Sequence, residues 1–277
     1  MKNKFGITAA AILVALSLAA CSSNKSNQSS SSSSKATSSK VEKKTSSQSS
    51  SSTSSSSSST SQSSKPSSQL PKESRISKLI SDLRKVFPNM ALPTNDGLGQ
   101  GSSKLNVRYN KSGNTNIIYY SVGNSAADFN AASVKNEKPY AVLTEVTNAS
   151  SSEASDLINY IPAQSGLPTK KLDSSTTATI QGAAGQRYLQ WNSDNYSFVI
   201  QASSQLKEDP TDRGKKVLAL YKQYGLPKTS NKGSLHVTVG DSVGSLNTVI
   251  AWQDGSNVYQ IQAHDTETAF KMLASLK

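Results

Sequence analysis

The sequence from residue 71 to residue 277 predicts an α+β fold in which antiparallel sheet packs on helices. Three observations support this prediction. Short runs such as 196–200 alternate apolar and polar residues, as half-buried strands do. Other segments, such as 73–87, carry apolar residues at helical spacing. A Leu-Pro pair also recurs after helical patterns, at Leu92-Pro93, Leu167-Pro168 and Leu226-Pro227.

The first part of this region predicts a helix, three strands and a second helix. In residues 73–87, Ile76, Leu79 and Leu83 share one helical face, and Pro88 ends the pattern because proline cannot continue a helix. The segments that follow are predicted as strands 105–109, 116–122 and 140–146, a short inserted helix 126–132, and a helix 153–160.

The second and third parts repeat this plan more closely. Asp209 is the expected N-cap of one helix, with Pro210 in its first turn. Trp191 and Trp252 occupy matching positions, each before a short polar turn and an alternating strand. The predicted elements are strands 177–181, 186–191 and 196–202, helix 211–224, strands 235–239, 248–252 and 258–263, and helix 266–276.

The whole region therefore suggests about three quasi-repeats of a helix, a Leu-Pro pair and three strands. Chance similarity among short α+β units is the alternative interpretation. The sequence leaves open whether residues 71–277 form one domain or two, with a possible sub-boundary near 163–168.

The N-terminus has the features of an export signal. Residues 1–4 are basic, residues 5–18 are an apolar run too short to span a bilayer comfortably, and Leu18-Ala19-Ala20-Cys21 follows. This segment resembles the lipobox of bacterial lipoproteins. The resemblance implies a signal peptide over 1–20, cleavage between Ala20 and Cys21, and diacylglycerol on the Cys21 thiol. An ordinary secretory signal followed by an incidental cysteine is the alternative.

Residues 21–70 predict a disordered tether. The segment is nearly all Ser, Thr, Gln, Asn and Lys, so it cannot bury enough apolar surface to offset the entropy of ordering. As a flexible coil it would span roughly 35–42 Å. In style, the lipobox, serine tether and small domain resemble surface lipoproteins of low-GC Gram-positive bacteria such as lactobacilli. That resemblance implies an acylated protein on the outer face of the cell membrane.

Charge and cysteine content limit the partners. The formal charge is +12, but residues 71–277 hold 22 Lys and Arg against 17 Asp and Glu, with both signs interspersed. A nucleic-acid-binding domain would show a dense basic face, so nucleic acid is not expected as a partner. The expected partners are the membrane, through the lipid, and a cell-wall polymer or envelope protein. Because Cys21 is the only cysteine, the folded part has no disulfide or thiol chemistry.

No catalytic constellation is predicted, and neither a metal nor another cofactor is expected. His236 and His264 lie in no recognisable catalytic or zinc-binding motif. Glu208, Asp209 and Asp212 are expected to stabilise the start of a helix rather than bind calcium. Trp191 and Trp252 are the candidates for stacking on a ligand, although their matched positions favour packing in the core.

The leading functional hypothesis is a non-enzymatic, lipid-anchored binding or scaffolding module of the cell envelope. One alternative is an extracellular or cell-wall hydrolase whose site is assembled from distant residues. Another is an envelope chaperone that binds apolar ligands.

Overall fold

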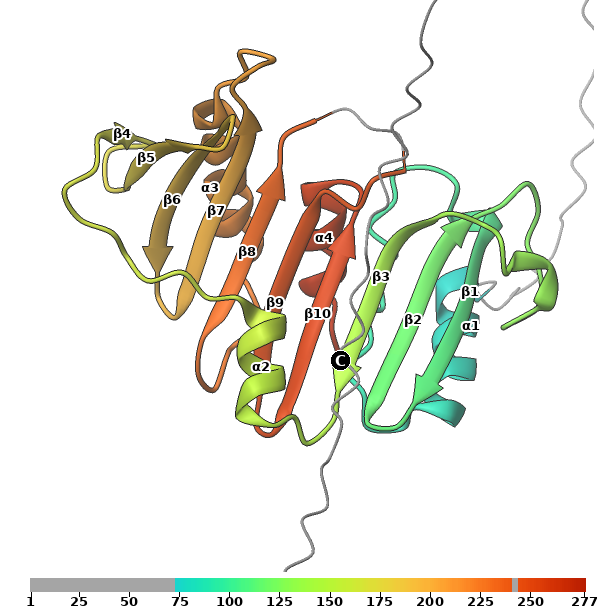
Figure 1. The fold of residues 1–277 in the computed structure, drawn as a ribbon. Coiled ribbons are helices and arrows are strands. Elements are labelled where there is room, and N and C mark those ends of the chain that lie inside the picture. Colours follow the sequence, from blue (N-terminus) through green and yellow to red (C-terminus); the bar gives the residue numbers. More distant parts are fainter. Residues whose placement is uncertain (1–72, 241–243) are drawn as a thin grey trace, which may run out of the picture. The chain divides into compact units, whose positions relative to one another are not determined.

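The computed structural model of the protein describes residues 73–240 and 244–277. In this part of the chain, ten strands form one sheet that is antiparallel except at one pairing, and four α-helices pack against it (Figure 1). The α+β class predicted from the sequence is confirmed. The strands are β1 (Leu105–Ser112), β2 (Thr115–Val122), β3 (Pro139–Val146), β4 (Thr169–Lys171), β5 (Thr177–Ala183), β6 (Gln186–Ser193), β7 (Tyr196–Ser203), β8 (Gly233–Thr238), β9 (Thr248–Asp254) and β10 (Asn257–Ala263). The helices are α1 (Arg75–Val86), α2 (Ser151–Ile158), α3 (Pro210–Tyr224) and α4 (Thr266–Leu273).

The order of strands across the sheet is β1-β2-β3-β10-β9-β8-β7-β6-β5-β4. Three runs of consecutive strands, β1 to β3, β4 to β7 and β8 to β10, each pair antiparallel within themselves. β7 and β8 pair in parallel, as expected for strands joined by a crossover helix, here α3. β3 pairs antiparallel with β10, so the first run and the end of the chain meet within the sheet.

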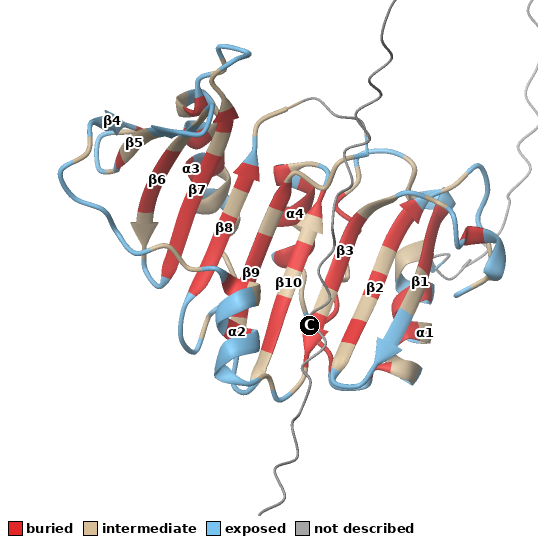
Figure 2. Cartoon of the chain, in the orientation of Figure 1, coloured by how far each residue is buried: buried red, intermediate tan, exposed pale blue. Residues whose placement is uncertain are grey.

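The helices cover the two faces of the sheet unequally. α1, α3 and α4 lie on one face, and α2 lies on the other, against β9 and β10 (Figure 1). Successive residues of a strand point to opposite faces, so each strand contributes to both layers. In β9, Ile250 and Trp252 belong to the main core, whereas Ala251 between them packs with Ile158 of α2. Figure 2 shows how the buried residues follow the strands and the inner sides of the helices.

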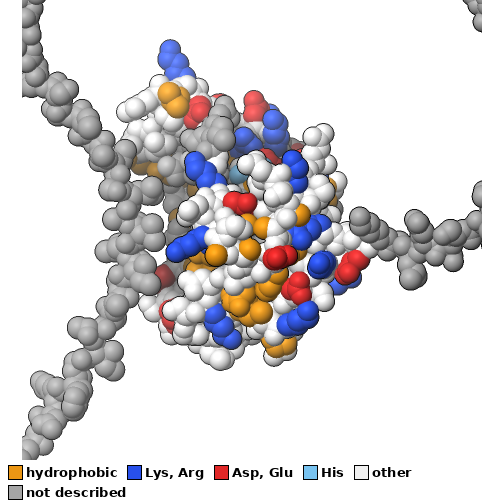
Figure 3. Space-filling model, turned by 90° about the vertical axis from the view of Figure 1, so that its right-hand side faces the viewer, with side chains coloured by type: hydrophobic (Ala, Val, Ile, Leu, Met, Phe, Trp, Pro, Cys, Tyr) orange, Lys and Arg blue, Asp and Glu red, His pale blue; other side chains and the backbone are white. Residues whose placement is uncertain are grey.

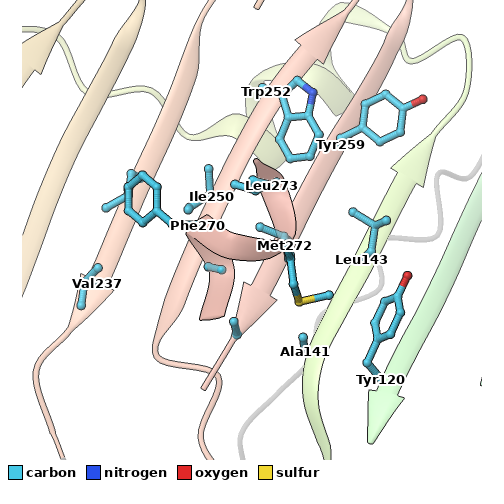
Figure 4. Close-up of a cluster of buried hydrophobic side chains, with 14 of the residues drawn as sticks. Tyr120, Ala141, Leu143, Val237, Ile250, Trp252, Tyr259, Phe270, Met272 and Leu273 are labelled. Carbon is cyan, nitrogen blue, oxygen red and sulfur yellow. The ribbon is translucent and has the colours of Figure 1, made fainter. Parts of the chain in front are cut away.

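The main core lies between the sheet and the three helices on its larger face. Phe270, Met272 and Leu273 of α4 pack onto side chains of β9, β10 and β3, including Ile250 and Leu143 (Figure 4). Phe270 and Leu143 are fully buried. Burial of side chains of this size contributes roughly 1.5–3 kcal/mol each. This core holds the sheet rigid and so fixes the positions of the residues at the ends of its strands.

Helix starts follow the capping residues in the sequence. Asp209 accepts a hydrogen bond from Thr211 N and Pro210 begins α3, which confirms both predictions. α2 begins with a complete capping box between Ser150 and Glu153. The remaining helices, α1 and α4, also begin at residues whose side chains accept hydrogen bonds from backbone N–H groups.

Two segments differ from the sequence-based expectation. No α-helix forms over residues 126–132; this stretch is a loop that leads into a short 3-10 helix, η2 (Ala132–Val134). The buried Asn106 side chain accepts the Ala127 N–H, and Asn130 adopts a left-handed backbone, so the segment is held against β1 instead. The edge strand β4 was not predicted from the sequence either. Lys170 and Lys171 of β4 are exposed, as expected of charges that protect a sheet edge from pairing.

Several sequence-based predictions lie outside the described residues. They are the signal peptide over 1–20, the cleavage site at Ala20 and Cys21, lipid attachment at Cys21, and the tether over 21–70. None of the helices in residues 73–240 and 244–277 is long and apolar enough to cross a membrane.

Candidate functional site

The two tryptophans are core residues. Trp191 is 4% exposed and stacks on Phe198, with ring centroids 4.8 Å apart, and Trp252 is 2% exposed and stacks on Tyr259 at 5.2 Å. Neither indole therefore presents an open face on which a sugar or another ligand could stack. The stacking role considered from the sequence has no accessible ring to support it, and core packing, the favoured interpretation, describes both residues.

The two histidines occupy different surroundings. His236 of β8 is half-buried on the face of the sheet that carries α2, and burial lowers the pKa of its imidazole. His264 follows β10, is exposed, and has Nδ1 3.3 Å from the Tyr140 carbonyl oxygen. Within the described part of the chain, no cluster of three or more His, Cys, Asp or Glu side chains could hold a metal ion.

The acidic residues at the start of α3 have structural partners. Asp209 caps the helix, Glu208 accepts a hydrogen bond from Ser203 N, and Asp212 pairs with Lys215 at 3.8 Å. Asp209 therefore caps the helix, as expected, whereas Glu208 binds the backbone at the end of β7. In the glycine-containing loop at 97–101, Gly97 is buried. Its φ is +71°, and a Cβ there would come within 2.6 Å of the Thr268 carbonyl oxygen of α4.

One hollow lies at one end of the sheet, where β3 and β9 begin and β8 and β10 end. We call it the basin; its volume is about 640 Å³. Thr248 and Thr266, which share a hydrogen bond of 2.9 Å, are buried in its wall. The polar groups at its rim come from three separate elements: Lys138 before β3, Arg213 of α3 and His264 after β10.

The described residues that line the basin carry an excess of positive charge. The ion pairs formed within residues 73–240 and 244–277 include neither Lys138 nor Arg213. The one carboxylate among the described lining residues, Asp265, accepts hydrogen bonds from Glu267 N and Thr268 N at the start of α4. Among the described residues of the lining, two cations and an imidazole therefore accompany a single carboxylate, which is engaged by backbone amides. Figure 3 shows positive and negative side chains interspersed on one side of the molecule.

A second hollow, at the opposite end of the strands, contains a buried carboxylate. We call it the cleft; its volume is about 260 Å³. Glu145, near the end of β3, is 3% exposed and accepts hydrogen bonds from Asn116 Nδ2 at 2.8 Å and from the Tyr259 hydroxyl at 2.6 Å. Burial and the hydrogen bond to Glu145 raise the pKa of Tyr259 to about 12. The phenol therefore remains a donor at neutral pH.

No protein-family model, curated protein or solved structure matches this chain. Any functional assignment must therefore come from its own residues.

Sequence reasoning missed both hollows, for different reasons. The basin joins residues 138, 213 and 264, which only the tertiary fold brings together. The cleft could have been suspected from the sequence, because Glu145 lies two and four residues after the core residues Leu143 and Ala141 and so on the same face of β3. Asn116 likewise lies on the same face of β2 as Ile118. A polar residue at a core position of a strand is the pattern that predicts a buried polar site.

Proposed function

We propose that this protein is a lipid-anchored binding module on the extracytoplasmic face of the cell membrane. Support for the anchor comes from the sequence: the basic N-terminus, the apolar run, the lipobox-like Leu18-Ala19-Ala20-Cys21 and the serine-rich segment occur in the order expected of a lipoprotein. Signal peptidase would cleave before Cys21, and the lipid on its thiol would hold the folded region through the tether. Durable anchoring would need two or more acyl chains, because one chain binds membranes only marginally.

We further propose that the basin is the binding site and that its ligand is an anionic, phosphate-bearing polymer of the cell envelope. The observation that carries this proposal is the pair of cations, Lys138 and Arg213, which face a hollow without a carboxylate partner in the described chain. Arginine and lysine both bind phosphate, arginine through two parallel N–H groups and lysine as a point charge. The exposed His264 adds a further hydrogen-bonding group at the rim.

The folded region is, in our proposal, assembled from three copies of one unit. Three groups of strands, β1–β3, β5–β7 and β8–β10, are each followed by a helix. The best-matched feature is the cross-strand stack of Trp191 on Phe198 and of Trp252 on Tyr259, because both pairs join the middle and last strands of their groups. The placement of α2 on the opposite face from α3 and α4 makes the first unit the most divergent.

The binding proposal can be tested with a charge-removal variant and a matched control. Lys138→Ala/Arg213→Ala should weaken binding to a purified phosphate-bearing wall polymer. Two charge contacts of about 0.5–1 kcal/mol each correspond to roughly five- to thirtyfold in affinity. Lys170→Ala/Lys171→Ala removes the same charge from the exposed β4 edge and should change affinity by less than twofold. Equal losses in both variants would show that net charge alone binds the polymer. Turnover of the polymer would favour the hydrolase alternative.

The anchoring proposal has a separate test. In cells given labelled palmitate, the wild-type chain should carry the label and sediment with membranes. Cys21→Ser should lose the label and appear in the medium or periplasm. Retention of the Cys21→Ser chain in the membrane fraction would refute lipid anchoring through this residue.

A further inference from the structure

The cleft has one polar wall and one apolar wall. Glu145, Asn116 and Asn257 line it on the sheet side. The residues that follow α1, among them Phe87 and Pro88, close it on the other. Its volume is about 260 Å³, more than a single water or a bare ion fills. The space therefore suits a short chain with one polar end better than a bare ion.

Glu145 is a buried acceptor that has neutral partners only. Asn116 Nδ2 donates to Oε2 at 2.8 Å, while the Tyr259 hydroxyl and Asn257 Nδ2 lie 2.6 and 3.4 Å from Oε1. No ion pair within residues 73–240 and 244–277 involves Glu145. Lys111 borders the cleft, but its Nζ lies over the Phe87 ring, 6.0 Å from the ring centroid. A buried carboxylate is costly unless a positive charge compensates it.

Asn116 supplies a second unsatisfied acceptor beside this carboxylate. The residue is 8% exposed, and its Oδ1 has no hydrogen-bond partner. The hydrogen bond from Nδ2 to Glu145 fixes the orientation of the Asn116 side-chain amide. If the amide were flipped, Oδ1 would face the carboxylate and this hydrogen bond would be lost. Leaving a buried acceptor without a donor is unfavourable. The polar wall therefore lacks a positive charge and at least one N–H donor.

We propose that the cleft binds a primary alkylammonium group, with the –NH₃⁺ on Glu145 and the methylene chain against the apolar wall. An ammonium has three N–H donors and supplies the charge that Glu145 lacks. A calcium ion is a poorer fit, because it takes six to eight oxygen ligands and the cleft offers a single carboxylate. The proposal uses a different hollow from the basin and does not depend on an anionic ligand there.

The test uses the full chain in neutral detergent and defined probes. Titration with n-butylammonium, followed by NMR of the side-chain amides, should give saturable shifts of the Asn116 NH₂ signals. n-Butanol lacks the charge and should not bind. Butyltrimethylammonium has the charge but no N–H, and should bind at least about tenfold more weakly, equivalent to about 1.4 kcal/mol. A lysine side chain in Nα-acetyl-lysine N-methylamide should bind as well as n-butylammonium if the natural ligand is a peptide, and less well if it is a free amine.

Variants then assign the site. Glu145→Gln keeps the shape and removes the charge, and should weaken n-butylammonium binding at least about tenfold, or about 1.4 kcal/mol. Glu73→Gln, at an exposed position, should change it less than twofold. The comparison of n-butylammonium, n-butanol and butyltrimethylammonium on the wild-type chain tests the proposal even if Glu145→Gln does not fold. Equal binding of n-butylammonium and butyltrimethylammonium, or no saturable shift with either, would overturn the proposal. So would binding that appears only in Lys111→Met, because Lys111 would then be the group that occupies the site.

Discussion

Gly214 of α3 provides a sharp test of how tightly this helix packs on the sheet. A Cβ at position 214 would lie less than 3.0 Å from Leu189 Cδ2 of β6, a separation that Cβ atoms in proteins essentially never show. It would also lie 3.7 Å from Trp191. Alanine is favoured over glycine in a helix interior by about 1 kcal/mol. Overpacking a rigid core costs about 1–3 kcal/mol, and Leu189 is fully buried. We therefore expect Gly214→Ala to lower the free energy of unfolding by up to about 2 kcal/mol, despite its better helix propensity.

A double-mutant cycle separates the steric term from the helical one. Leu189→Ala alone should cost about 2–5 kcal/mol through the cavity it leaves. In that background the clash is absent, so Gly214→Ala should become neutral or stabilising by up to about 1 kcal/mol. The coupling measured by urea unfolding of the four chains should be about 2 kcal/mol. An effect of Gly214→Ala that is the same in both backgrounds, within about 0.5 kcal/mol, would refute the steric argument.

Three further predictions concern stability and titration. Phe270→Ala should lower the free energy of unfolding by about 3–5 kcal/mol, because this fully buried ring anchors α4; a loss below about 1 kcal/mol would contradict that packing. Ser150→Ala should cost about 1 kcal/mol through the lost cap of α2. The Ser150 hydroxyl and amide hold the pKa of Glu153 below its ordinary value, so the Glu153 pKa measured by NMR should rise in this variant. Burial holds the pKa of His236 below 6.5. The unfolded chain therefore binds the proton more readily, and stability should decline as pH falls below about 6.5 and level off below the folded-state pKa. His236→Gln should remove this slope, and an unchanged slope would show that another group causes it.

The parts of the fold that follow from local chemistry were predictable from the sequence. Alternation of apolar residues identified β7 and β10 to within a residue or two at each end, and Asp209-Pro210 identified the start of α3. These signals act within a few residues, and the same interactions persist in the folded chain. The predicted helix at 126–132 was wrong because its decisive contact, Asn106 Oδ1 with Ala127 N, joins residues 21 apart. No local pattern reports such a contact.

The order of the strands was less accessible to sequence reasoning than their existence. Nothing in the sequence indicates that β3 pairs with β10, because more than 100 residues separate the two strands. The same limit applies to the basin, whose rim residues lie on three elements. Glu145 is a different case: its position on the core-facing side of a strand was visible, and a carboxylate there predicts a buried polar network. The short edge strand β4 gave little signal because its three exposed residues lack alternation.

The geometry of the sheet predicts that the basin and the cleft act independently. Asn257 lines the cleft and His264 borders the basin, and the seven residue steps between them along β10 span about 23 Å at roughly 3.3 Å each. Charges that far apart are screened at physiological salt, where the Debye length is about 8 Å. Lys138→Ala/Arg213→Ala should therefore leave n-butylammonium affinity unchanged within twofold, and Glu145→Gln should leave polymer affinity unchanged within the same margin. The contrary result is a variant of one hollow that loses affinity for the ligand of the other hollow while its unfolding midpoint matches that of the wild type. That result would mean that the sheet transmits a conformational change and that the two hollows form one coupled site.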